Sequence, residues 1–265
     1  MRFRLKALGL HLLASSIVLT LVLGTLYLGW YRWPGWYLTD VANVLLVLAG
    51  VDLAVGPLLT SVVAGPGKPR RELRRDIAMI VTVQLAALTY GAVSLWSGRP
   101  LYYAYSENVL QLVQAYDINA SELALARQRK APIIPHWYSL PQWIWAPLPQ
   151  DPDERARIVA SAIGGGDDVI AMPRYYQPWA QGLGTLREQL KQVDDVPYFA
   201  RSQKDELKAA MRVAGLATDQ LNSMTLTGRG PPLLAVFDPR SLKLRALCQS
   251  ARSRTRGAAC HTVGS

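Results

Sequence analysis

The side chains best placed to do chemistry are a few polar residues inside long apolar runs. Asp52 and Gln84 each interrupt such a run. A carboxyl group at that depth in a membrane costs roughly 2.5–3.5 kcal/mol on insertion scales, so Asp52 needs a partner or a role. Gly56 lies one turn later, and Pro57 removes a backbone hydrogen bond and should kink the helix. These residues predict an intramembrane polar notch.

Three roles for this notch remain open. It could be a proton relay or a site that binds a partner. Alternatively, a neutral Asp52 could make an interhelical hydrogen bond, with Gln84 as its neighbour, that only holds the helices together. Both functions could also combine, because such a notch can meet a polar group on another protein's transmembrane helix.

Motifs for catalysis or metal binding are weak. His11, His136 and His261 have no Cys, Asp or Glu at ligand spacing, so we expect interfacial or surface histidines and no metal site. The glycine-rich run at 164–168 follows an expected helix and lacks a GK[ST] ending, which favours a linker over a phosphate loop. No Ser or Cys lies in a nucleophile-elbow context. The sequence therefore indicates no enzyme, no cofactor and no small-molecule substrate.

The two cysteines lie near the C-terminus. Cys248 and Cys260 flank a stretch that contains Arg252, Arg254 and Arg256. In an oxidising compartment they can pair and close a loop of about a dozen residues. Such a disulfide would stabilise the basic C-terminal tail by on the order of 2–3 kcal/mol relative to an unfolded tail. Two free thiols are the alternative.

The elements that must position the polar notch are three apolar segments, at about 8–31, 38–64 and 77–97. Each reaches about 20 residues, the length that crosses roughly 30 Å of hydrocarbon. Buried helices of a soluble core seldom run so long without charge, so these segments predict three transmembrane helices. The first segment is too long for a cleaved signal peptide and is interpreted as a signal anchor.

Basic residues in the short loops predict the orientation. They gather before the first segment and in the second loop, whereas the first loop has only Arg32; they are Arg2, Arg4, Lys6, Lys68, Arg70, Arg71, Arg74 and Arg75. The N-terminus and second loop are therefore expected in the cytoplasm, and residues 98–265 in the bacterial periplasm. Much of the net charge of +10 then reflects topology and anionic membrane lipid, which argues against nucleic-acid binding.

Residues 98–265 are long enough for one compact α+β domain on the anchor formed by residues 1–97. Strands are expected at 101–105, 110–116, 233–237 and 242–247, with a possible short strand at 169–172. Helices are expected at 121–128, 151–163, 183–193 and 202–214, the last opened by Ser202 and Asp205. The segment 132–152, rich in Pro and Trp, is expected to be extended, with its Trp residues in packing, at lipid headgroups or on a ligand face.

Several runs in this chain resemble one family. They are 50–60, Gly67-Lys68, 73–76, 84–91 and Arg99-Pro100, with looser agreement at 116–118, 228–230 and 235–238. Together they are similar to the type IV pilin accessory proteins of the TfpX/TfpZ (FimB-like) group. The resemblance adds Tyr90 to the candidate notch of Asp52, Gly56, Pro57 and Gln84. It also marks Arg99 and Pro100 as a membrane-proximal pair.

This resemblance implies an inner-membrane protein that binds, stabilises or delivers a pilin, with no catalytic motif. A pilin before assembly is a single transmembrane helix with a periplasmic head, and a three-helix protein with its own periplasmic domain could contact both parts at once. The alternatives are a membrane-anchored transferase of the envelope and a periplasmic sensor. Against the sensor, only one short loop and the N-terminus are expected inside.

Overall fold

The computed structural model of the protein describes residues 2–65, 67–218, 220–251 and 257–263. Arg252, Arg254 and Arg256 lie outside the described residues. The chain forms two compact units, which are described separately below. The first contains Met1–Trp36 and Asp40–Arg99, and the second contains Tyr37–Thr39 and Pro100–Ser265. The second unit therefore includes three residues of the loop between the first two apolar segments.

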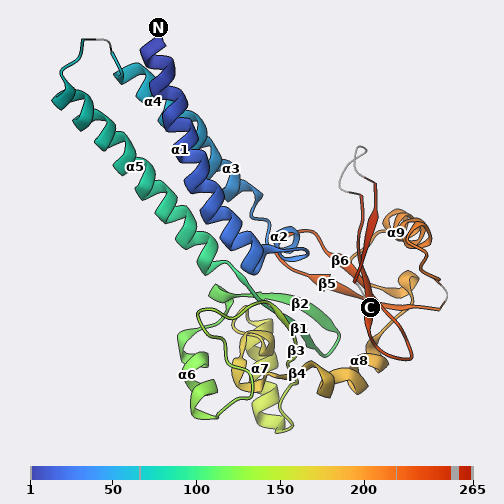
Figure 1. Ribbon diagram of the computed structural model, residues 1–265. Helices are drawn as coiled ribbons and strands as arrows, with labels where there is room; N and C mark the ends of the chain where they lie inside the picture. The colour runs from blue at the N-terminus through green and yellow to red at the C-terminus, as the bar shows by residue number, and fades with distance from the viewer. Residues whose placement is uncertain (1, 66, 219, 252–256, 264–265) are drawn as a thin grey trace. The chain divides into compact units, whose positions relative to one another are not determined.

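The described part of the first unit contains three long helical segments, which Figure 1 shows. α1 (Arg2–Leu26) continues into a π-helical turn, η1 (Tyr27–Tyr31). The second segment consists of α3 (Ala42–Gly50), the π-turn η2 (Val51–Val55) and α4 (Gly56–Val63). α5 (Arg70–Ser97) is the third. All three segments are long and apolar enough to cross a membrane.

All three of these helical segments begin elsewhere than the hydrophobic pattern predicts. The first begins at Arg2 instead of 8. The second begins at Ala42 instead of 38, because the short helix α2 (Gly35–Leu38) and a turn at Asp40, whose φ is +54°, come first. The third begins at Arg70 instead of 77, directly after Pro69. Its first residues are mostly Arg and Glu, which favour helix as strongly as apolar residues do.

Close packing in the first unit depends on small residues. α1 packs against η2 and α4, and α5 packs against α3 and α4. A Cβ atom on Gly91 of α5 would lie 2.3 Å from a methyl carbon of Leu48 of α3, so a larger residue here would require the Leu48 side chain to move. The buried core of the unit is apolar and consists of Leu19, Leu26, Tyr31, Leu48, Leu88 and Leu95.

The second unit contains an eight-stranded mixed sheet with the strand order β4-β3-β1-β2-β5-β6-β7-β8. The strands are β1 (Pro100–Ser106), β2 (Val109–Gln114), β3 (Gln142–Trp145), β4 (Gln177–Pro178), β5 (Asn222–Thr227), β6 (Leu233–Phe237), β7 (Leu244–Gln249) and β8 (Ala259–Thr262). β1 pairs with β3, and β2 with β5, in parallel; the other neighbours are antiparallel.

Helices cover this sheet in two places. α7 (Pro152–Ile163) contributes Ile158 to a core with β1 and β3. α9 (Arg201–Val213) contributes Leu207 and Met211 to a second core with β6 and β7. The remaining helices of more than one turn are α6 (Ala120–Gln128) and α8 (Leu183–Gln189).

Most expected elements of the second unit are confirmed, including the hairpin of β6 and β7 and the cap of α7, where Asp151 accepts from the Glu154 amide at 2.8 Å. The possible strand at 169–172 is wrong, because Val169–Ala171 forms a 3₁₀ turn with Asp168 as its cap. α8 ends at Gln189, earlier than expected. The cap of α9 is also different: the Gln203 side chain binds the Ala200 amide at 2.8 Å.

The C-terminal segment contains a strand instead of a free tail. β8 pairs with β7 and places Cys260 directly opposite Cys248, and the two residues form a disulfide. The bond closes a hairpin at one edge of the sheet.

The extended Pro- and Trp-rich segment contains β3. Trp143 on this strand packs against Tyr103 and Trp179, with ring centroids 4.8 and 5.4 Å away. Trp137 differs, because 72% of its surface is exposed.

The segment Tyr37–Thr39 is bound tightly within the second unit. Tyr37 and Leu38 are buried, and the Gly230 amide donates to the Leu38 carbonyl at 2.7 Å. A Cβ atom on Gly230 would lie 2.1 Å from the Tyr37 carbonyl oxygen, and one on Gly228 would lie 2.5 Å from the Leu38 oxygen. Both glycines are therefore required by the close approach of this loop.

Candidate functional site

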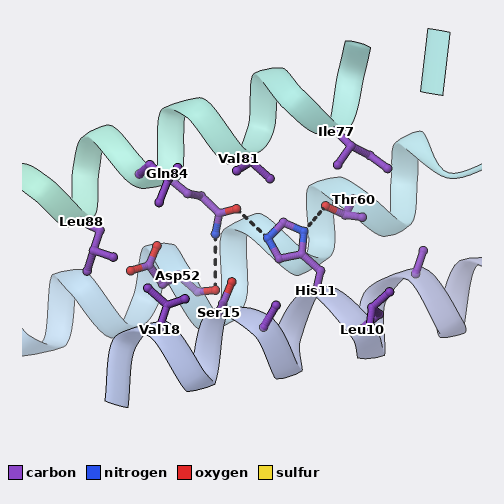
Figure 2. A pocket seen from close by; sticks show the side chains of 13 residues that line it. Leu10, His11, Ser15, Val18, Asp52, Thr60, Ile77, Val81, Gln84 and Leu88 are labelled. Carbon is purple, nitrogen blue, oxygen red and sulfur yellow. Dashed lines mark hydrogen bonds between the residues drawn. The ribbon is translucent and has the colours of Figure 1, made fainter. Parts of the chain in front are cut away.

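Polar side chains from all three long helical segments meet inside the first unit. His11 comes from α1, Thr60 from α4 and Gln84 from α5, and Asp52 lies in the π-turn η2 (Figure 2). We call His11, Asp52, Thr60 and Gln84 the polar cluster. The cluster includes two residues of the predicted notch and two that the notch did not include.

The π-turn and Pro57 together leave one backbone carbonyl without a helical partner. The Gly56 amide bonds to the Val51 carbonyl, five residues back, and so does not reach the Asp52 carbonyl. The next amide along the helix would belong to Pro57, which has no N–H. The Asp52 carbonyl instead accepts from Nε2 of Gln84 at 3.5 Å. The proline expected to kink the helix therefore creates an acceptor that another helix satisfies.

Gly56 gives Gln84 access to this carbonyl. A Cβ atom at position 56 would lie 1.9 Å from Nε2 of Gln84, far closer than two such non-bonded atoms can approach. The Gly-Pro pair thus has two complementary effects. Proline frees the acceptor, and glycine makes room for the donor.

The hydrogen bonds of the cluster also fit one of the two tautomers of a neutral His11 ring. Because Gln84 donates through Nε2, its Oε1 faces His11 and must accept from Nε2–H of the ring, at 2.7 Å. Nδ1 of a neutral ring then accepts from the Thr60 hydroxyl, at 2.6 Å. The chain of bonds runs from Thr60 through His11 and Gln84 to the backbone at Asp52. His11 is therefore half-buried and hydrogen-bonded to two other helical segments, which the expectation of a surface or interfacial residue did not include.

Among the described residues, the Asp52 carboxyl group is the part of this cluster that keeps an atom without a hydrogen-bond partner. The residue is only 5% exposed, and its Oδ2 atom has no hydrogen-bond partner among the described residues. A buried polar atom without a hydrogen-bond partner is costly and therefore requires an explanation.

A cleft of about 350 Å³ adjoins the polar cluster. α1 and α5 form its two walls, and Asp52 and Thr60 line it from the second segment (Figure 2). The remaining lining is mostly apolar, so the polar cluster is the part of the cleft that can form directional interactions. No group of three or more His, Cys, Asp or Glu residues that could hold a metal ion occurs in the described part of the chain.

The other candidate residues lie apart from this cleft. Tyr90 is 78% exposed and does not line it. Pro57 is buried in the first turn of α4. Arg99 is buried at the end of the first unit, where its guanidinium donates to the Trp96 carbonyl at 2.7 Å and lies 4.3 Å from the Trp96 ring centroid. Pro100 begins β1.

Sequence reasoning missed His11 and Thr60 because each lies in a mostly apolar helix and finds its hydrogen-bond partner in another helix. Only the packing of three helices shows that they share a site. The available signal was depth, because an imidazole inside a predicted membrane span needs a partner just as Asp52 does.

Two segments on which the family resemblance partly rests, 116–118 and 228–230, lie in contact in the second unit. Arg229, between the two glycines that accept the loop, lies 3.4 Å from Oδ1 of Asp117, and its guanidinium carbon lies 4.3 Å from the centroid of the Tyr116 ring. These contacts connect η3 (Ala115–Asp117) to the segment that holds Tyr37–Thr39.

Several buried and half-buried ionisable groups of the second unit are paired with a neighbouring group. Arg174 contacts Glu122 at 2.9 Å, and burial raises the pKa of that carboxyl group although the arginine opposes the shift. Tyr175 donates to Glu154, which also contacts Arg129 at 3.3 Å. The tyrosine hydrogen bond holds the pKa of Glu154 below its ordinary value. These pairs connect α6, η5 (Pro173–Tyr175) and α7 and indicate a structural role.

Comparison with known proteins points to one functional class. Fimbrial assembly proteins of Dichelobacter nodosus, from serogroups E1 and I, are 25% and 27% identical to this chain, and each match covers 82% of the chain and 84% of the relative. The protein of serogroups C1 and C2 is 29% identical over 47% of this chain and 95% of its own length. No protein-family model and no solved structure matches. The chain is therefore a distant relative, over most of its length, of proteins named for fimbrial assembly.

Proposed function

We propose that this protein is a non-enzymatic accessory factor of type IV pilus biogenesis, of the TfpX/TfpZ kind, that binds or stabilises a pilin at the bacterial inner membrane. The observation that carries the proposal is the similarity to fimbrial assembly proteins over 82% of the chain. The three apolar helices and the sheet unit suit a partner that has a membrane helix and a head outside the membrane.

The packing of the first loop supports a periplasmic sheet unit. Tyr37–Thr39 lies between the first two apolar segments and belongs to the sheet unit, so the loop and the sheet must lie on the same side of the membrane. The loop between α4 and α5 contains Lys68 and is followed by four arginines, which favours the cytoplasm for the opposite side. Three crossings satisfy both conditions.

A binding role agrees better with the polar groups than catalysis does. In the second unit, Glu122 and Glu154 are occupied by Arg174, Tyr175 and Arg129. In the first unit, the polar cluster lies against an apolar cleft, which suits an apolar partner with a polar group.

Deletion of the gene, followed by complementation, tests this function. We expect loss of surface pili or of pilin stability, restored by the wild-type copy, and co-purification of pilin with the tagged full-length protein in mild detergent. Normal pili and normal pilin levels in the deletion strain would contradict the proposal, as would turnover of a substrate by the purified protein.

A further inference from the structure

We infer that the cleft between α1 and α5 is a groove for one transmembrane helix of the partner, and that this helix carries a hydrogen-bond donor for the Asp52 carboxyl group. The inference rests on the proposed function and names the site and the chemistry of contact. The donor is a hydroxyl, amide or amine on an otherwise apolar helix.

The unsatisfied oxygen of Asp52 is the first argument. Gln84 satisfies the backbone carbonyl of Asp52, and His11 and Thr60 satisfy each other and Gln84. Among the described residues, Oδ2 is buried without a hydrogen-bond partner, in a residue that lines the cleft. A carboxyl group keeps an acceptor oxygen in either protonation state, so a hydrogen-bond donor on the partner completes the cluster. An acyl chain could fill the apolar part of the cleft but offers no donor.

The shape of the walls is the second argument. Each wall is one face of a helix, with residues at intervals of three and four positions. On α1 they are Ala7, Leu10, His11, Ala14, Ser15 and Val18. On α5 they are Ile77, Val81, Gln84, Leu85 and Leu88. Each row is about 16 Å long, or roughly three helical turns, at 1.5 Å per residue. Two rows of this length match the side of one additional helix, which the partner would supply.

The composition of the walls is the third argument. Leu10, Val18, Val81 and Leu85 keep more than a third of their surface exposed, so an apolar rim is available for contact. On α1, Ala7, Ala14 and Ser15 are small and permit close approach of a backbone. A cleft of about 350 Å³ holds a few side chains of a helix that lies against its two walls, not a whole helix.

Photo-crosslinking from two positions of α5 tests the groove. Val81 lines the cleft; Val83, on the same helix, is 63% exposed and does not line it. A photoreactive amino acid is placed at either position of the full-length protein, in cells that make the cognate pilin. We expect the pilin adduct from position 81 to exceed that from position 83 at least tenfold and to map to the apolar helix of the pilin.

Substitution of Asp52 tests the donor. We expect Asp52→Leu to reduce the pilin adduct from position 81 roughly three- to fifteen-fold, the range that one interhelical hydrogen bond in a membrane supports. Asp52→Asn keeps an acceptor oxygen and should retain most of the adduct. Expression and thermal unfolding of each variant establish that it folds, and the comparison of positions 81 and 83 in the wild type does not depend on either variant.

The outcomes separate this inference from the proposed function. Adducts to lipid alone, or equal pilin adducts from both positions, overturn the groove, while co-purification of pilin with the tagged protein would still support the function. An Asp52-dependent adduct between position 81 and the helix of another protein supports the groove. If the deletion strain nevertheless has normal pili, the proposed function is contradicted while the groove stands.

Discussion

Four side chains from three helical segments determine the chemistry of the first unit. Gln84 bridges the ring of His11 and the backbone carbonyl at Asp52, and Thr60 completes the other side of the ring. Each of these groups would be costly alone in hydrocarbon, and among the described residues they satisfy one another except at Oδ2 of Asp52. At the scale of residues, the polar cluster is therefore a site in which one carboxyl oxygen still needs a hydrogen-bond partner.

Substitution of Gly56 by alanine should disrupt this site without changing its polar residues. The new Cβ atom would displace the Gln84 carboxamide, because its place lies 1.9 Å from Nε2. We expect a loss of about 1–2 kcal/mol of stability in detergent, since His11 and the Asp52 carbonyl each lose a partner. Thermal unfolding measures it. Gly50→Ala in the same segment is the matched control, because a Cβ atom there meets nothing within 4 Å. Equal effects of the two variants would contradict the arrangement.

The Tyr175–Glu154 pair in the second unit should make stability depend on pH. The hydrogen bond from Tyr175 holds the pKa of Glu154 below its ordinary value, so its contribution is present above about pH 4.5 and is lost as the pH falls through the lowered pKa. We expect Tyr175→Phe to lose about 1 kcal/mol at pH 7, a figure reduced for partial exposure, and less at about pH 3. Unfolding at both pH values measures it.

Tyr116→Phe is the control for this prediction. The Tyr116 hydroxyl donates to Oε1 of Gln114, a neutral acceptor, at 2.6 Å. Its loss should cost the same at both pH values. A pH-independent effect of Tyr175→Phe would mean that the Glu154 carboxylate does not accept this bond.

At the scale of elements, two glycine-containing motifs admit a neighbouring segment. Gly56-Pro57 lets the Gln84 side chain of α5 approach the backbone of η2 and α4. Gly228-Arg229-Gly230, in the turn after β5, lets the backbone of the loop Tyr37–Thr39 approach in the same way. In both cases the absence of a side chain allows a hydrogen bond that a larger residue would block. The first motif satisfies a carbonyl within the helices, and the second binds the loop to the sheet unit.

Substitution of Gly230 by alanine should release the loop from the sheet unit. The Cβ atom would lie 2.1 Å from the Tyr37 carbonyl oxygen, and because this is backbone the clash cannot be relieved by a side-chain rotation. We expect cleavage by chymotrypsin after Tyr37 or Leu38, both buried in the wild type, together with a lower melting temperature. Gly184→Ala, where a Cβ atom has open space, should leave the loop protected. Continued protection in Gly230→Ala would show that the loop is held by other contacts.

At the scale of the whole molecule, the chain places membrane-compatible helices and a mixed sheet in separate units. The first loop nevertheless belongs to the sheet unit. This assignment links the topology of the helices to the fold of the second unit, because residues on opposite sides of a bilayer cannot pack together. Packing of the loop requires that the first loop and the sheet unit share one side of the membrane, and charge in the loops predicts that this side is the periplasm.

Reporter fusions at two points of the chain test this orientation. Alkaline phosphatase fused after Val263 should be active, because the sheet unit is expected in the periplasm, and a fusion after Lys68 should be inactive. A fluorescent protein that matures only in the cytoplasm should give the reverse pattern. Phosphatase activity at Lys68 would contradict the orientation.

Local pattern alone determined the three long helices, the helix after Asp151 and the hairpin of β6 and β7. Each depends on neighbours in sequence: an apolar run, a capping residue with a following proline, or two strands joined by a short turn. Such signals are local, so the sequence alone predicts that these elements exist, although it misplaced the starts of the long helices.

The remaining features depended on contacts between distant residues. The parallel pairing of β2 with β5 joins Leu110 to Leu226, and β8 becomes a strand by pairing with β7. The contact between His11 and Gln84 crosses 73 positions. Only the tertiary structure decided these features, because a single polar residue or short extended segment has no partner until the chain folds and non-local packing supplies one.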